Sequence, residues 1–407
     1  MEAATRKRDL RDSSPVWAST PSISVITSKS AASRSYDVII VGAGISGALV
    51  AEALADGKRS ILIIDRRKPV TGSTMASTAM IQHEIDTPLT DLSRMIGDEQ
   101  AARAWRRSAA SVKALGKKVK SLEIACGFEE KATLYLAGED GGARKLSAEF
   151  RAREAAGVEA RYLNADAVNS DYSLDREAGL LSQASASANP AQLTAGLLRS
   201  ARQRNVEIVE GIEITDLAEF SDRVALATSS GALLNAAHVV FCTGYEFLER
   251  VGHKSHSIAS TWALATPKQT NLPEWLNDML VWEAADPYLY FRMTRDGRMI
   301  AGGEDENDPE AYHSKAKMAA KPKKIMKKLS ALLGMKLPEP EFTWSAGFGV
   351  TPTGLPYIDH VPGMSRAFAV MGFGGNGITF SQIASEIISA ELKGKPDPDR
   401  DLFKFPA

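Results

Sequence analysis

The sequence predicts an α/β protein, α+β over the whole chain, built from two domains that are each discontinuous in the sequence. Three observations indicate this class. A buried strand, a glycine turn, a helix and a second buried strand occupy residues 36–65. A similar strand, glycine turn and helix occupy residues 367–392. Between them, short strands with alternating apolar residues from 257 to 303 predict a mixed or antiparallel sheet.

Composition limits the possible classes of function. The 407 residues fit two or three domains of roughly 100–200 residues each. With 44% hydrophobic and 24% charged residues, a normal core is expected, and a net charge of −1 provides no global attraction for nucleic acid. Cys126 and Cys242 are far apart, which excludes a disulfide framework and a multi-cysteine metal site and favours a reducing, cytoplasmic location. The apolar stretch 38–54 is too short and polar to span a membrane.

Three segments are predicted to be solvated. Residues 1–35 show no sustained helical or strand period and are expected to form a tail, as are residues 396–407 at the other end. The basic cluster at residues 6–8 is expected to be part of this solvated tail; the alternative is that it acts as a sorting signal or binds nucleic acid. Residues 315–328 contain seven lysines, which predict the solvated side of a helix balanced by the acidic stretch 304–310. A phosphate- or membrane-binding helix is the alternative.

The first strand–turn–helix–strand unit carries the sharpest motif. Residues 37–41 are a β-branched run typical of a buried parallel strand. Gly42, Gly44 and Gly47 then form a G-x-G-x-x-G pattern, in which the first permits the tight turn, the second lets a pyrophosphate approach and the third lets the helix pack on the strand. Ile45 and Ser46 open this helix, whose positive end faces the phosphates.

The second strand, residues 60–65, ends in Asp65, which is positioned to accept the hydroxyls of an adenosine ribose. The same charge repels a 2′-phosphate and argues against NADP, although Arg66, which is also expected at the cofactor, and Arg67 follow. The unit therefore predicts a Rossmann-like domain that binds NAD or FAD.

The remaining elements follow in order. A helix is expected over residues 92–120, and another begins at the cap Asn189 with Pro190 in its first turn and ends near residue 205. The expected strands are residues 132–136, 206–209, 212–217, 223–228, 238–242 and 288–292.

The second glycine turn, residues 372–377, cannot begin another dinucleotide domain, because the thirty residues after Gly377 provide one helix and no ribose-binding strand. Its positive helix end suits a group that becomes anionic, such as the pyrimidine part of a reduced flavin. The two turns together predict FAD.

From about residue 37 to residue 392 the chain resembles the FAD-dependent D-amino-acid oxidase superfamily, the group of glycine and sarcosine oxidases. The resemblance rests on four segments in order: residues 41–48, 72–80, 239–244 and 371–379. It implies an FAD domain from residues 36–90, 185–250 and 343–395, and a substrate domain from 91–184 and 251–342.

The resemblance also implies site residues. The pyrophosphate and flavin are expected to contact Thr74, Met75, Ser77, Thr78 and Met80. The backbone of Ile214 is expected at the adenine, with Thr243 and Gly244 closing that side. The pyrimidine ring is expected to meet Gly374, Gly375, Asn376, Gly377, Ile378 and Thr379.

The chemistry that the resemblance implies is oxidation of an amine or amino acid by hydride transfer to flavin, with O₂, a quinone or a carrier protein as electron acceptor. The FAD is expected to be non-covalent. Ala346 stands where sarcosine-oxidase relatives have the attaching cysteine, and residues 72–76 contain no histidine. His83 is a rival attachment point.

The substrate anchors of the relatives are missing. Phe348 and Gly375 stand where glycine-oxidase relatives have arginines, and Ile300 replaces the oxygen-activating lysine of sarcosine-oxidase relatives. Missing arginines indicate that the substrate is a secondary amine or a larger amine without an α-carboxylate.

The best substitute is Arg292, whose strand predicts one face shared with Tyr288 and Tyr290. Alternatively, Arg292 pairs with Glu283 or Asp286 on the surface. The weaker candidates are Lys268 and His83.

Two other functions stay open. Oxidation of a 2-hydroxy acid or alcohol needs a base, with His83, His313 and His360 as the candidates. A non-catalytic flavoprotein that docks a partner through the lysine-rich segment is the other.

Overall fold

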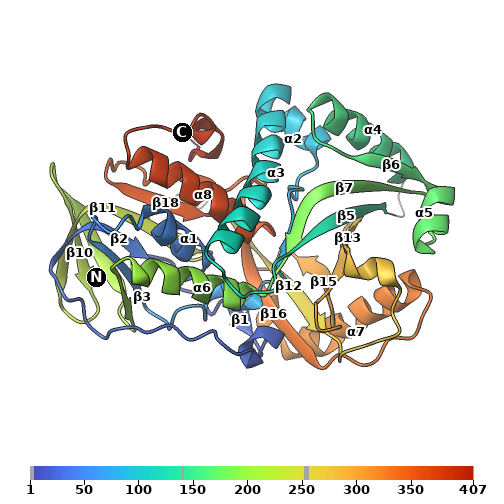
Figure 1. The fold of residues 1–407 in the computed structure, drawn as a ribbon, viewed down its shortest axis with the longest axis horizontal. Coiled ribbons are helices and arrows are strands. Elements are labelled where there is room, and N and C mark those ends of the chain that lie inside the picture. The colour runs from blue at the N-terminus through green and yellow to red at the C-terminus, as the bar shows by residue number, and fades with distance from the viewer. Residues whose placement is uncertain (1–3, 139–141, 252–255, 407) are drawn as a thin grey trace.

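The computed structural model describes residues 4–138, 142–251 and 256–406, which form two sheets with helices around them (Figure 1). The first sheet has the order β17-β18-β11-β2-β3-β8, with β10 beside β11 and β9 beside β10. Strands β18, β11, β2, β3 and β8 run parallel to their neighbours in that series. The strands are β2 (Ser35–Val41), β3 (Ile61–Asp65), β8 (Val206–Glu210), β9 (Ile214–Glu219), β10 (Val224–Thr228), β11 (Leu233–Gly244), β17 (Tyr357–His360) and β18 (Ala367–Met371).

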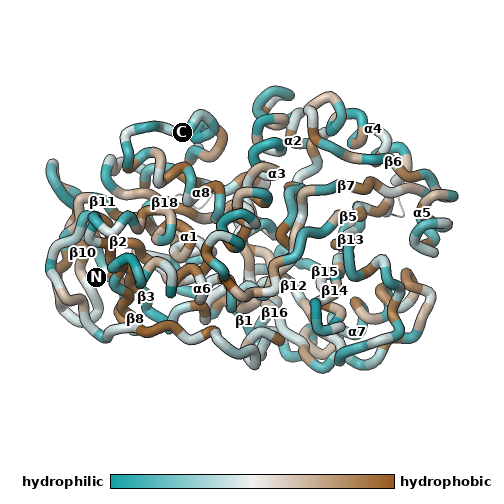
Figure 2. The backbone as a smooth tube through the Cα atoms, viewed as in Figure 1, coloured by the Kyte–Doolittle hydropathy of each residue, from teal (hydrophilic) through white to brown (hydrophobic). Residues whose placement is uncertain are grey.

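The two central strands are buried on both faces, as their apolar runs predict. Ile40 and Ile63 pack on one face with helices α1 (Ile45–Leu54), α6 (Pro190–Gln203) and α8 (Gly377–Glu391). The alternate residues of the same strands pack on the other face against β9 and β10. Figure 2 shows the hydrophobic stretches gathered around β3, β8 and α8. The Rossmann-like part of the predicted fold is confirmed.

The second sheet is mixed, as predicted, with the order β1-β16-β12-β15-β14-β13-β5-β7-β4 and with β6 beside β7. Only β13 and β5 pair in parallel within it. Its strands are β1 (Arg11–Asp12), β4 (Met80–Ile81), β5 (Glu129–Ala137), β6 (Arg161–Asn164), β7 (Ala178–Ser187), β12 (Ser257–Ala265), β13 (Met279–Ala284), β14 (Leu289–Met293), β15 (Met299–Glu306) and β16 (Phe342–Val350). The accompanying helices are α2 (Leu89–Ile96), α3 (Asp98–Ser121), α4 (Gly142–Ala155), α5 (Ala165–Tyr172) and α7 (Lys315–Leu332).

The N-terminal segment is not the solvated tail that its composition suggests. Strand β1 pairs with β16, and Val16 and Trp17 are each 5% exposed. The Trp17 indole N–H donates to the Ser77 carbonyl at 2.7 Å. The prediction was wrong because isolated large apolar side chains, without any period, make these long-range contacts.

The basic cluster of this segment is also engaged. Lys7 pairs with Glu213 at 2.8 Å, and the backbone N–H of Arg6 donates to the Phe247 carbonyl at 2.8 Å. The C-terminal segment packs too, with Phe403 1% exposed. The solvated tail predicted there was therefore wrong as well.

The lysine-rich segment behaves as the charge balance predicts. Lys324 and Lys328 of α7 each lie 2.5 Å from a carboxylate oxygen of Glu304, and Lys317 lies 2.5 Å from Glu306.

Strand β16 lies in the second sheet, so the expected domain boundary at residue 343 does not coincide with the change of sheet. Within the described chain, no helix combines the length and apolar character needed to cross a bilayer.

Candidate functional site

A single cavity of about 1610 Å³ joins the two glycine turns. Ligand pockets for drug-sized molecules measure roughly 300–1,000 Å³, so this cavity has room for a larger cofactor together with a substrate. Its walls come from both sheets, with Thr5 and Leu10 of the N-terminal segment also contributing.

The first glycine turn has the close approaches that its motif requires. Gly42 has φ +116°, and a Cβ added there would lie 2.3 Å from the carbonyl oxygen of Cys242. A Cβ at Gly47 would lie 1.9 Å from the Gly42 carbonyl oxygen, so the helix packs on the turn as predicted. Only glycine fits at either position.

Polar groups gather at the start of α1. The Thr74 hydroxyl accepts the N–H of Ile45 at 3.0 Å, and a Cβ on Gly44 would lie 3.1 Å from that hydroxyl. The neighbouring Ser73 hydroxyl is buried and has no hydrogen-bond partner within the described chain. This positive, partly unsatisfied cradle suits a pyrophosphate.

Asp65 lines the cavity at the end of β3. Its Oδ2 accepts the N–H of Ala43 and its Oδ1 accepts the N–H of Arg67, both at 2.7 Å. Each oxygen keeps a lone pair for a ribose hydroxyl. Burial raises the pKa of Asp65, and these two backbone bonds oppose the rise.

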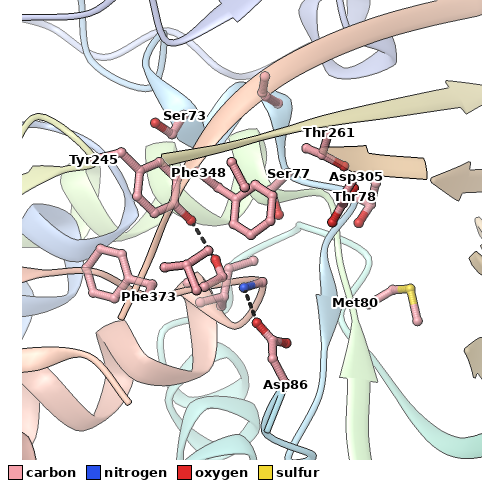
Figure 3. A pocket seen from close by; sticks show the side chains of 18 of the residues that line it. Ser73, Ser77, Thr78, Met80, Asp86, Tyr245, Thr261, Asp305, Phe348 and Phe373 are labelled. Atoms are coloured by element: carbon pink, nitrogen blue, oxygen red, sulfur yellow. Dashed lines mark hydrogen bonds between the residues drawn. The ribbon is translucent and has the colours of Figure 1, made fainter. Parts of the chain in front are cut away.

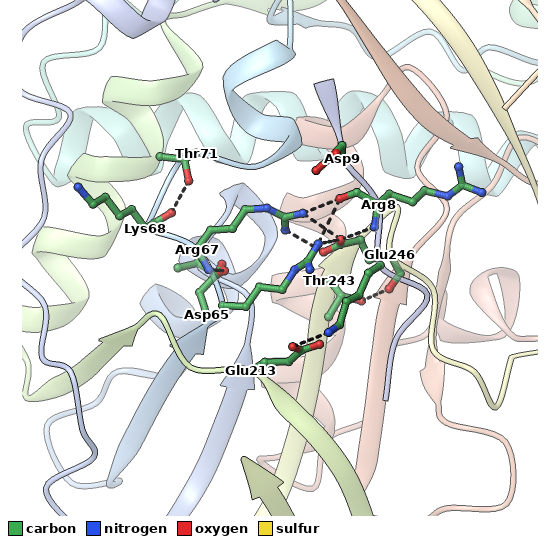
Figure 4. Close-up of polar contacts among 12 residues, drawn as sticks. Arg8, Asp9, Asp65, Arg67, Lys68, Thr71, Glu213, Thr243 and Glu246 are labelled. Atoms are coloured by element: carbon green, nitrogen blue, oxygen red, sulfur yellow. Dashed lines mark hydrogen bonds and ion pairs between the residues drawn. The ribbon is translucent and has the colours of Figure 1, made fainter. Parts of the chain in front are cut away.

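The arginines that follow Asp65 are neutralised within the protein. Arg66 and Arg67 both pair with Glu246, and the second guanidinium also donates to the Arg8 carbonyl at 2.8 Å (Figure 4). The N-terminal segment thereby closes over this end of the cavity.

Most residues expected at the cofactor line the cavity. They are Gly42, Gly44, Ile45, Ser46, Asp65, Arg66, Thr74, Ser77, Thr78, Met80, Ile214, Thr243, Gly244, Gly374, Gly375, Gly377 and Ile378. Four others do not line it: Gly47 packs the helix on the turn, Met75 is a core residue, Asn376 donates to the Glu84 carbonyl at 2.9 Å and Thr379 donates to the Gln82 carbonyl at 2.8 Å. Asn376 and Thr379 hold the second glycine turn from behind, and direct contact of Met75, Asn376 and Thr379 with FAD stays a prediction.

A carboxylate that sequence reasoning missed, Asp86, contacts the second glycine turn. Asp86 Oδ2 accepts the N–H of Gly375 at 2.6 Å, and the Tyr245 hydroxyl donates to the Gly374 carbonyl at 2.8 Å (Figure 3). Burial raises the pKa of Asp86. A carboxylate thus faces the positive start of α8.

The opposite wall of this end contains a second missed acid, Asp305, beside the predicted tyrosines. Tyr288 donates to Asp305 Oδ2 at 2.7 Å, and the rings of Tyr288 and Tyr290 lie 5.8 Å apart. In Figure 3, Asp305, Thr261 and Thr78 are drawn close together. In the same view, Phe348 lies between this group and Tyr245. The strand alternation rightly predicts that both tyrosines share this face.

Arg292 does not join them, and its prediction as a substrate anchor was wrong. It is 2% exposed and is absent from the cavity wall. Its guanidinium donates to the carbonyls of Thr78 at 2.8 Å and Ala188 at 3.1 Å. It pairs with neither Glu283 nor Asp286 within the described chain. Burial lowers the pKa of Arg292 to about 9.

His83 also lies outside the cavity wall, so its predicted catalytic role was wrong. It is 1% exposed, and its Nδ1 lies 3.0 Å from the Ser185 hydroxyl. Burial lowers its pKa to about 4. His83 is a neutral core residue.

The missed acids had different sequence signals. Asp305 lies in the acidic stretch that was assigned to balance the lysines, yet strand alternation separates it from Glu304 and Glu306, which pair with α7. Asp86 follows a short apolar strand, and nothing local indicates that it meets a turn nearly 300 residues away.

Comparison with known proteins places this site in context. The family model described as FAD dependent oxidoreductase (DAO) matches residues 37–391. The probable oxidoreductase OrdL of Haemophilus influenzae is 18% identical over 375 residues, covering 88% of this chain and 83% of that protein.

Two solved structures share the fold. Glycine oxidase from Geobacillus kaustophilus superposes with a TM-score of 0.75 at 19% identity, covering 92% of this chain and 99% of its own. L-α-glycerophosphate oxidase from Mycoplasma pneumoniae, solved with FAD bound, gives a TM-score of 0.72 at 15% identity, covering 92% and 100%.

Proposed function

Because the chain belongs to the family of FAD-dependent oxidoreductases known as DAO, we propose that it oxidises the C–N bond of a small amine or amino acid. FAD is its cofactor, and when bound it supplies the acceptor for a hydride from the carbon next to nitrogen. The FAD is proposed to be dissociable, since the rival attachment residue, His83, lies outside the cavity wall.

The chain's own residues bind and orient the two molecules. Gly42, Gly44 and the start of α1 hold the pyrophosphate, with the Ser73 and Thr74 hydroxyls beside it. The second glycine turn would border the flavin when FAD is bound. Tyr288, Tyr290 and Phe348 enclose the remaining space and exclude water from the reacting carbon and nitrogen.

The observation that carries the proposal is the single cavity bordered by both glycine turns. One turn has the cradle for a pyrophosphate. The other lies at an end enclosed by aromatic residues, where a substrate beside the flavin fits. The strongly basic arginine or catalytic histidine of other chemistries is not needed for hydride removal from a neutral amine.

Oxidation of a 2-hydroxy acid receives less support from this site. The three histidines considered as its base, His83, His313 and His360, are all absent from the described cavity wall. The lysine helix is engaged by Glu304 and Glu306, which weakens a docking role for it. A reducing, cytoplasmic location stays a proposal from the sequence, in which the only two cysteines, Cys126 and Cys242, are far apart.

Anaerobic reduction of the flavin tests the proposal. The holoenzyme is mixed with amines, α-amino acids and 2-hydroxy acids, and loss of the yellow flavin absorbance is followed. Bleaching by amines or amino acids supports C–N oxidation, whereas bleaching by hydroxy acids alone or by none of them contradicts it. Peroxide formation in air then separates O₂ from a quinone or carrier as the acceptor.

A further inference from the structure

The charges around the cavity are distributed unequally. Six cationic residues line it among those described: Arg66, Arg67, Arg94, Lys145, Arg176 and Lys328. The first two pair with Glu246, and Arg176 and Lys328 pair with Glu283 and Glu304. The other two are exposed on α4 and α2. None of the six contacts the two tyrosines or Asp305 in any recorded bond or ring contact.

The end beside the second glycine turn is instead acidic. Asp305 uses Oδ2 to accept the Tyr288 hydroxyl. Its Oδ1 is buried and has no hydrogen-bond partner by distance and angle within the described chain, and the Thr261 hydroxyl lies close enough to the carboxyl to favour its ionised form. A buried, unpaired carboxylate oxygen is costly, and a bound cation that donates a hydrogen bond removes that cost. Asp86 adds a second carboxyl to the same end.

The neighbouring side chains also suit a cation. Tyr288 and Tyr290 present two adjacent aromatic rings, and the face of an aromatic ring attracts an ammonium group. Phe348 adds a third ring to the cavity wall. An α-carboxylate at this place would meet two carboxyls, and the repulsion would oppose binding, since the neighbouring cation, Lys321, lies outside the cavity wall and pairs with Glu306 at 2.8 Å.

We propose that Asp305 binds the substrate ammonium group through Oδ1 and accepts one of its protons, which leaves the neutral amine that C–N oxidation requires, so that the substrate class is an amine without an α-carboxylate. The proposal rests on the proposed C–N oxidation and specifies its substrate. Tyr288 is a positioning residue, because its hydroxyl fixes the Asp305 carboxylate and leaves the second oxygen toward the ligand.

Matched pairs of probes test the substrate class. Anaerobic flavin reduction is compared for putrescine against ornithine and for tyramine against tyrosine, in which each pair differs only by the α-carboxylate. Reduction by the amine at least tenfold faster than by its amino acid is expected. If the amino acids reduce the flavin as fast or faster, C–N oxidation stands and the present inference is overturned; if no probe reduces it, the proposed function itself fails.

Variants test the residue. Asp305→Asn keeps the shape and the bond from Tyr288 but removes the charge, and it is expected to lower kcat/KM for the faster amine at least 30-fold, mainly through KM. Tyr288→Phe is expected to lower it about tenfold. Glu310→Gln, which removes a charge from an exposed position of the same acidic stretch, is the matched control and is expected to stay within twofold. An Asp305→Asn enzyme within threefold of the wild type would overturn the inference.

Two further measurements separate recognition from a structural role. Guanidinium, which donates hydrogen bonds but has no C–H bond to oxidise, is expected to perturb the flavin spectrum of the holoenzyme at lower concentration than acetate, and Asp305→Asn is expected to abolish that preference. The kcat/KM for the amine is expected to fall as pH falls through about 6, since burial and Asp86 raise the pKa of Asp305 while Thr261, Tyr288 and Lys321 oppose the rise. Loss of this acid limb in Asp305→Asn supports the inference, and its retention contradicts it.

Discussion

Replacement of Arg153 tests whether a buried ion network holds the cavity wall. This arginine of α4 is fully buried, pairs with Glu149 at 2.9 Å and also with Glu84, and lies 4.6 Å from the centre of the Trp105 ring. Glu84 in turn accepts the Trp282 indole N–H at 2.7 Å. The network therefore joins the helix to a residue of the wall.

Arg153→Met keeps most of the volume but leaves two buried carboxylates without their cation. Removing one partner of a buried pair costs about 3–5 kcal/mol. With an unfolding entropy near 2.1 cal/mol/K per residue, this corresponds to a fall in Tm of roughly 3–6 °C for a chain of this length. Arg94→Met is the control, because Arg94 pairs with Asp91 at 2.6 Å with side chains 77% and 48% exposed. That pair is worth about 0–1 kcal/mol.

The assay is thermal unfolding of the holoenzyme followed by circular dichroism and by flavin release. Burial raises the pKa of Glu149, but Arg153 and the backbone N–H groups of Thr90 and Leu89 outweigh it and hold the pKa below its usual value. The stabilisation is thus present above the unfolded pKa of Glu149 and is lost as pH falls, so the effect of Arg153→Met is expected to shrink in acid. A fall in Tm below 1 °C at neutral pH, or one equal to that of Arg94→Met, would refute the reasoning.

Two remaining predictions concern cofactor retention. Trp17→Ala removes a buried indole and its bond to the Ser77 carbonyl in the cavity wall, so a stability loss of about 3–5 kcal/mol and a Kd for FAD at least tenfold higher are expected in titrations of the apoprotein. Trp17→Phe is expected to be intermediate, and an unchanged Kd in Trp17→Ala would contradict the role. Denaturation followed by filtration is expected to release the yellow flavin, and flavin left on the polypeptide would disprove non-covalent binding.

Local rules predicted the parts of the fold whose contacts are themselves local. The strand expected at residues 37–41 is β2, and the second expected strand is β3, because burial on both faces demands a continuous apolar run. Asn189 caps α6 as expected, accepting the N–H of Ala191 and of Gln192, both at 3.1 Å. Such features need only neighbouring residues.

The N-terminal segment could not be predicted in this way. Its contacts join Trp17 to Ser77 and Tyr312 to Asp9, residues that are far apart in the chain. A single large side chain that packs in a distant pocket leaves no period in its own segment. Only the fold of the rest of the chain defines that pocket.

In the candidate site, too, features set by neighbouring residues could be predicted and long-range contacts could not. Alternation correctly assigned Tyr288 and Tyr290 to one face, but it gave no information on the course of a long side chain. Arg292 begins on that strand and reaches the carbonyls of Thr78 and Ala188 instead. The short side chain of Asp305 follows its strand position, so the same rule applied to β15 would have separated it from Glu304 and Glu306.

The stability of the protein provides an independent check on Asp305. Burial raises its pKa from 3.8 to about 6, so the folded state binds protons more tightly than the unfolded state does. The ionised carboxylate therefore opposes folding at neutral pH, by about 3 kcal/mol at 1.36 kcal/mol per unit. Asp305→Asn removes this cost and is expected to raise the Tm of the ligand-free enzyme, while amine turnover falls. A residue kept only for packing would show the reverse, since its replacement lowers Tm, and a lower Tm in Asp305→Asn would count against a destabilised carboxylate held for a cationic substrate.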